Sequence, residues 1–116
     1  MSIAYWILAG LVAILFLGSG LMKLTSSKEK LLSNERMGWA QDFSSSQIKL
    51  IGFVEILGAL GLILPHALSI AEWLTKAAAV GLFLIMAGAA NVHRKRKEPF
   101  LPPLVIGFLA LVTLFL

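Results

Sequence analysis

Four apolar stretches dominate this chain, and each is long enough, or nearly so, to cross a lipid bilayer as a helix. A helix needs about 17 to 25 mostly apolar residues to span the hydrocarbon core. Residues 3–22 contain no formal charge, and further candidates are residues 48–64, 74–92 and 100–116. Helices satisfy their own backbone polar groups inside a membrane. We therefore expect an all-α, four-helix transmembrane bundle that forms a single domain over residues 1–116.

Prolines mark one end of two of these stretches. Pro65 follows the second stretch and is expected to end its helix, because proline lacks the N–H that a helix interior needs. Pro102 and Pro103 open the fourth stretch, where first-turn prolines are tolerated. We expect this last helix to begin near Phe100, since a start at Leu104 leaves it too short to cross.

The composition excludes several classes of protein. Apolar residues make up 59% of the chain and charged residues 14%, against about 45 to 50% and about 25% in soluble domains. This excess of apolar residues excludes soluble globular and disordered proteins. The sequence contains no cysteine, which excludes disulfides, thiolate metal sites and thiol redox centres. We also find no phosphate-binding glycine motif and no Ser-His-Asp set, so we predict no metal site and no catalytic residues.

The basic residues predict the orientation. Nine of the ten lysines and arginines lie on the side shared by the first and third connections: Lys23, Lys28, Lys30, Arg36, Lys49, Arg94, Lys95, Arg96 and Lys97. The opposite side has only Lys76. Because basic short loops stay in the cytoplasm, we expect both termini outside. Residues 93–97 are then a topology signal that can also contact anionic membrane lipid, and nucleic acid is not an expected partner.

The first connection, residues 23–47, is the only long one. Ser26 followed by Glu29 predicts a capping box for a short interfacial helix over residues 27–37 on the cytoplasmic side. The connection also contains scattered apolar residues: Leu31, Leu32, Met37, Trp39 and Phe43. We expect it to lie over the cytoplasmic mouth of the bundle. It is either a lid or a packed connector, and we favour the connector.

Glu55 is the most informative residue inside a predicted span. An ionisable group at such a position is costly, usually faces the bundle interior, and is a functional-site hypothesis by default. It lies about 10 Å inside the cytoplasmic end of its helix and shares a face with Gly52, Ala59 and Leu62. The spans are otherwise rich in glycine and alanine, which allow close helix packing and leave self-association into a homo-oligomer open.

Three further residues complete a candidate polar cluster. Ser19 and Lys23 are four residues apart and share one face of the first span, at the same membrane depth as Glu55. In the third span we favour His93 over Asn91, because small neighbours leave space on the face of His93. The cluster of Ser19, Lys23, Glu55 and His93 is either a structural Lys23–Glu55 ion pair, which we favour, a ligand, proton or cofactor site, or a set of unrelated interfacial residues.

Three segments resemble the DoxX-like branch of the DoxX family. They are residues 18–24 (GSGLMKL), residues 51–65 (IGFVEILGALGLILP) and residues 89–93 (AANVH). The similarity covers nearly the whole chain, in order and with matching spacing. It implies a compact four-helix protein that crosses the bacterial inner membrane several times, with Lys23, Glu55 and His93 at the family's polar positions.

What the resemblance implies about function is broader. The family is named after a subunit linked to thiosulfate:quinone oxidoreduction, and a larger superfamily of similar bundles includes sterol isomerases and lipid-binding proteins. We expect a non-enzymatic membrane protein that binds a hydrophobic ligand, such as a quinone or lipid, or supports a respiratory or stress-related membrane complex. The alternatives are a proton-coupled exporter that uses Glu55 and a membrane enzyme that uses Glu55 or His93 as acid or base.

Overall fold

The structure is a computed structural model that describes residues 2–116, except for the side chains of residues 35 and 36. Its elements are α1 (Ile3–Thr25), α2 (Lys28–Leu32), the 3-10 segment η1 (Glu35–Asp42), α3 (Ser45–Leu68), α4 (Trp73–Lys95), α5 (Leu101–Val112) and η2 (Thr113–Phe115). Residues 2–116 contain no β-strand. The helices α1, α3 and α4 are long and apolar enough to cross a membrane, and α5 with η2 forms a shorter apolar helix. The all-α prediction is confirmed.

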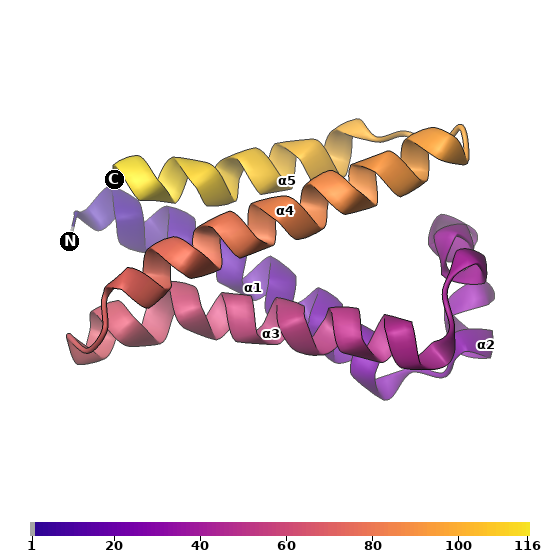
Figure 1. The fold of residues 1–116 in the computed structure, drawn as a ribbon, viewed down its shortest axis with the longest axis horizontal. Coiled ribbons are helices and arrows are strands. Elements are labelled where there is room, and N and C mark those ends of the chain that lie inside the picture. Colours follow the sequence, from indigo (N-terminus) through magenta and orange to yellow (C-terminus); the bar gives the residue numbers. More distant parts are fainter. Residues whose placement is uncertain (1) are drawn as a thin grey trace.

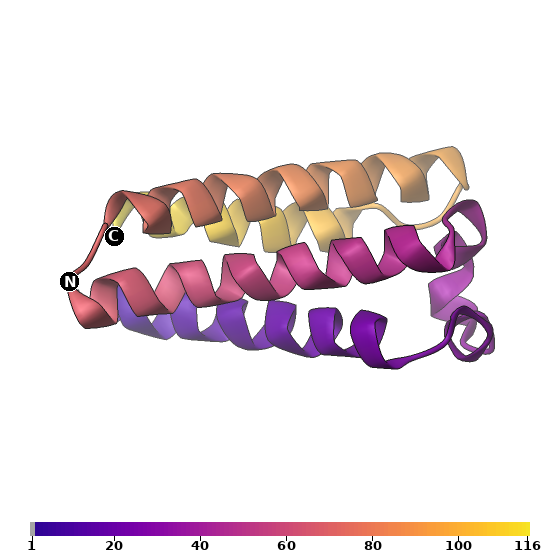
Figure 2. The same ribbon diagram turned by 60° about the horizontal axis from the view of Figure 1, so that its bottom comes forward.

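The three long helices and the shorter α5 form two pairs that lie side by side. α1 packs along α3, α5 packs along α4, and α3 joins the pairs by packing against α4 (Figures 1 and 2). Both chain termini and the α3–α4 turn lie at one end, which we call the terminal end (Figure 1). At the other end, which we call the capped end, α2 and η1 lie beside the connection between α4 and α5. All nine basic residues of the predicted cytoplasmic side belong to this capped end.

The core lies along the centre of the bundle and draws on every long helix. Its largest members are Val12 and Phe16 from α1, Leu62 from α3 and Leu82 from α4, and α5 contributes Ala110. Large apolar side chains also cover the outside, and Ile3, Leu11, Leu64 and Phe108 are among those exposed. An outer surface this apolar is typical of helices that face lipid.

The helix around Pro65 differs from the prediction. α3 continues through Pro65 to Leu68, so the expectation that Pro65 ends the helix is wrong. The missing N–H costs one hydrogen bond in the last turn, where few bonds remain to be lost. Ser69 then adopts a left-handed conformation, and the amide of Ile70 donates to the carbonyl oxygen of Pro65 at 3.0 Å, which closes the helix.

The short helix of the first connection is capped by a different serine than predicted, and it ends at Leu32 rather than near residue 37. Ser27, not Ser26, caps α2 and accepts from the amide of Lys30 at 3.1 Å. Ser26 instead ends α1, and its backbone amide donates to the carbonyl oxygen of Met22. The capping box in this part of the chain is instead at the start of α3, where Ser44 and Gln47 bond each other's backbone amides.

The α2 and η1 segments have a small core of their own. Leu31 and Ala40 are buried together with Ile48 at the start of α3. Leu32, Met37, Trp39 and Phe43 pack around them, and these are the scattered apolar residues of the sequence. This small core holds the connection across the capped end.

Candidate functional site

Lys23 and Glu55 form a buried ion pair near the capped end of the bundle. The Lys23 Nζ lies 2.5 Å from Oε1 of Glu55 and donates to Oγ of Ser19 at 2.7 Å. Ser19 in turn donates to Oε2 of Glu55 at 3.1 Å. Glu55 is 1% exposed and Lys23 8% exposed. Each polar group of this triad therefore has a partner, as burial away from water requires.

The sequence places these three side chains together through helix geometry. Gly52, Glu55, Ala59 and Leu62 are all buried on one face of α3, as predicted from their spacing. A β-carbon on Gly52 would lie 2.8 Å from Cβ of Lys23, so the absence of a side chain there lets α1 and α3 approach closely.

Trp39 of η1 covers the ammonium group. The Lys23 Nζ lies 5.4 Å from the centroid of the Trp39 ring, within the range of a cation–π contact. Phe43 packs edge-on against Trp39, with ring centroids 5.8 Å apart. The first connection thus contributes directly to the surroundings of the ion pair.

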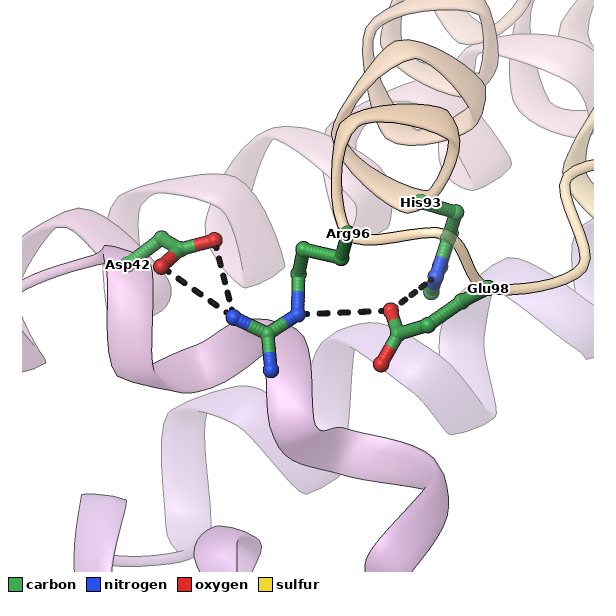
Figure 3. A network of polar contacts seen from close by, with 4 residues as sticks. All are labelled: Asp42, His93, Arg96 and Glu98. Carbon is green, nitrogen blue, oxygen red and sulfur yellow. Dashed lines mark hydrogen bonds and ion pairs between the residues drawn. The ribbon is translucent and has the colours of Figure 1, made fainter.

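His93 lies at the same end of the bundle but has a different partner. Its Nδ1 lies 3.0 Å from Oε1 of Glu98, and the same carboxylate oxygen lies 3.4 Å from Nε of Arg96. Arg96 reaches across to η1, where its Nη1 donates to both carboxylate oxygens of Asp42 at 3.2 Å (Figure 3). A chain of polar contacts therefore connects His93 to η1.

The end of α4 creates this arrangement. Lys97 has a φ of 59°, and this left-handed residue turns the chain back so that the amide of Glu98 donates to the carbonyl oxygen of His93 at 2.8 Å. The hydrogen bond from His93 and the nearby Arg96 guanidinium hold the pKa of Glu98 below its usual value. The hydrogen bond to Asp42 raises the pKa of Arg96 further above its already high value.

A cavity of about 630 Å³ lies between the helix pairs at the capped end. Its walls come from α1, α3, α4, α5 and the η1 region, and they are mostly apolar: Ile51, Leu84, Met86, Pro102, Pro103 and Ile106 are among the lining residues. Ser19, Lys23 and His93 supply polar groups, and Trp39 and Phe43 lie on the side of the first connection. A volume of this size is typical of small-molecule sites.

The structure thus brings Ser19, Lys23 and Glu55 into direct contact and places His93 on the wall of the same cavity. Asn91, the residue that we did not favour, is exposed and accepts from Arg94 at 2.9 Å. Among the described side chains, no three His, Asp or Glu residues are grouped so that they could hold a metal ion.

Two residues of this region were not predicted as part of a site. Trp39 is one of the scattered apolar residues of the connection, and an aromatic residue in a connection over the bundle mouth is the signal that could have found it. Glu98 gave no signal, because its approach to His93 depends on the left-handed backbone of Lys97.

Comparison with known protein families identifies the family of this chain. The model of the DoxX-like family matches residues 7–115, which is nearly the whole chain. No curated protein matches this chain, and no solved structure matches it. With this family match and three long apolar helices, the chain is a small membrane protein that belongs to the DoxX-like family.

Proposed function

We propose that this protein is a four-helix transmembrane bundle of the bacterial inner membrane that binds a hydrophobic small molecule, such as a quinone or lipid, in the cavity at its capped end. The capped end faces the cytoplasm and both termini lie outside. The observation that carries the proposal is the cavity itself, which is apolar along α4 and α5 and polar where Ser19, Lys23 and His93 meet it.

Such a cavity suits an amphiphile. An apolar tail fits against residues such as Leu84, Met86 and Ile106, and a small headgroup reaches the polar atoms near the capped end. A few polar groups in an apolar wall fix the orientation of a ligand. The polar residues therefore act as binding residues, and Trp39 covers the headgroup from the cytoplasmic side.

Glu55 supports binding more than proton-coupled export or acid–base chemistry. Its carboxylate is 1% exposed and bonded to both Lys23 and Ser19, and it does not line the cavity. A carboxylate that exchanges protons with a substrate needs contact with it. In the proposed function Glu55 positions Lys23.

Two matched glycine variants test the proposal. A β-carbon on Gly88, which lines the cavity, or on Gly18, which does not, meets no atom within 4 Å. Gly88→Leu should therefore add a side chain at the cavity wall without a clash at its β-carbon, and Gly18→Leu should add the same side chain at an exposed position of α1. Native mass spectrometry of gently extracted protein should show a bound small molecule in the parent and in Gly18→Leu, and its loss in Gly88→Leu. Equal occupancy in all three would contradict the proposal.

The orientation has a separate test. Because the chain has no cysteine, single cysteines can be introduced at Ser27 in the capped end and at Ser69 in the terminal end. An impermeant thiol reagent added to intact cells should label Ser69→Cys and leave Ser27→Cys unlabelled until the membrane is opened. The reverse pattern would place the capped end outside.

A further inference from the structure

The two nitrogen-bearing side chains of the cavity wall are each paired with a glutamate. Among the side chains that the structure describes, Lys23 and His93 are the ionisable groups that line the cavity. Glu55 Oε1 lies 2.5 Å from the Lys23 Nζ, and Glu98 Oε1 lies 3.0 Å from the His93 Nδ1. Neither glutamate lines the cavity. The polar end therefore offers hydrogen-bonding groups without an unpaired positive charge.

We propose that this cavity selects uncharged amphiphiles with a hydroxyl or carbonyl headgroup, and that Glu55 is the residue that excludes carboxylates. The inference rests on the proposed function and names the class of ligand that the cavity takes. The selectivity acts on the headgroup of the ligand, because an apolar tail that moves from the bilayer into the cavity exchanges one apolar environment for another. The selectivity must then come from the polar end.

A carboxylate headgroup is disfavoured by the pairing of Lys23. A buried anion needs a cation of its own, and the charge of Lys23 is already balanced by the fully buried Glu55. A second carboxylate beside the same ammonium would face Glu55 at short range, and like charges at such a distance repel strongly. Arg96 offers no spare charge, because it is paired with Asp42 and Glu98.

The uncharged oxygen of a hydroxyl or carbonyl headgroup is not repelled by Glu55. An ammonium group has three N–H donors, and those of Lys23 have two protein partners, Oε1 of Glu55 and Oγ of Ser19. A third donor is therefore left for a hydroxyl or carbonyl oxygen. At His93, Nδ1 contacts Glu98, so Nε2 is the ring nitrogen that can meet a headgroup. A cationic headgroup would instead be repelled by Lys23, which already occupies the face of Trp39.

The test uses the fluorescence of Trp39 in bilayers. Trp6 and Trp73 are both near the terminal end and are changed to phenylalanine, so that Trp39 is the remaining indole. The probes are dibrominated octadecanol and dibrominated stearate, whose bromine atoms quench an indole on contact, used at a pH where stearate is ionised. We expect saturable quenching by the alcohol in the parent chain, and binding of stearate that is weaker by at least about tenfold, because juxtaposed like charges are strongly unfavourable.

The Glu55→Gln variant should reverse this preference, because Lys23 then has an unpaired charge that a carboxylate can balance. Glu29→Gln is the matched control, since Glu29 is an exposed glutamate at the same end and its loss should leave the preference unchanged. If Glu55→Gln does not fold, the comparison of the two probes in the parent chain decides alone. Equal saturable binding of both probes overturns the charge selection and leaves the proposed function standing. Absence of saturable quenching by either probe overturns the proposed function itself.

Discussion

The backbones of Gly20 and Gly52 meet so closely that neither position has room for a side chain. A β-carbon on Gly20 would lie 2.6 Å from the carbonyl oxygen of Gly52, and one on Gly52 would lie 2.7 Å from the carbonyl oxygen of Gly20. Lys23 and Glu55 each lie three residues further along the same helices. The glycine contact thus sets the separation of α1 and α3 at which the ion pair forms.

Gly20→Ala should therefore destabilise the bundle. The added methyl group forces α1 and α3 apart, and overpacking of this kind costs about 1 to 3 kcal/mol. Thermal unfolding in detergent measures the effect. Gly18→Ala in the same helix is the control, because a β-carbon at Gly18 meets no atom within 4 Å. Equal melting of the two variants would show that the glycine contact does not limit the approach of the helices.

The Lys23–Glu55 pair should show strong coupling in a double-mutant cycle. Removing one partner leaves a buried charge without compensation, which costs about 3 to 5 kcal/mol, whereas removing both costs far less. We expect Glu55→Gln and Lys23→Met each to lower the free energy of unfolding, and the double variant to recover much of the loss. Strictly additive effects would mean that the two residues do not stabilise each other in the membrane protein.

Helix periodicity accounts for most of what the sequence could predict. The shared face of Gly52, Glu55, Ala59 and Leu62, and the preference for His93 over Asn91, both follow from the rotation of about 100° per residue. Glu55 stood out because a charge inside an apolar helix is costly. These arguments need only one helix at a time, and the structure brings Ser19, Lys23 and Glu55 into contact while His93 lies at the same end with a different partner.

Features that depend on the ends of helices could not be predicted in the same way. Whether Ser26 ends α1 or begins α2 depends on which bond its backbone makes, since both roles suit serine. The helix α3 continues past Pro65 because only its last turn remains after this residue, so the missing N–H of proline costs little there. Glu98 reaches His93 through a left-handed lysine that no residue preference indicates. The size of the cavity depends on how the helix pairs diverge, which is a property of the whole fold.

Arg96 should hold η1 against the end of α4. Its guanidinium contacts both oxygens of Asp42, and η1 has only a small core of its own. We expect Arg96→Gln to speed amide hydrogen exchange in residues 37–43 by several-fold, while the fold of the long helices is unchanged. Lys95→Gln removes an exposed positive charge from the same turn and should have no such effect. Equal exchange in both variants would show that the Asp42 contact does not hold η1.

The same contacts should depend on the protonation of Glu98. The hydrogen bond from His93 and the nearby Arg96 lower the pKa of Glu98 in the folded protein. The stabilisation that the ionised Glu98 carboxylate contributes is therefore fully present above the ordinary glutamate pKa of about 4.3. It is lost as the pH falls through the lowered value, when the carboxylate gains a proton. Protection of residues 37–43, corrected for intrinsic exchange rates, should therefore decrease in acid. Glu98→Gln should remove that part of the pH dependence, and an unchanged profile would show that Glu98 is not its source.

The central claim is that a hydrophobic ligand occupies the cavity between the helix pairs. The most direct measurement is photolabelling in bilayers with a diazirine-bearing octadecanol, followed by mass-spectrometric mapping of the modified residues. We predict labels on cavity residues such as Met86, Ala89 and Ile106, and loss of these labels with excess unlabelled octadecanol. Labels confined to outward-facing residues such as Leu11 and Phe108, and insensitive to competition, would contradict the claim.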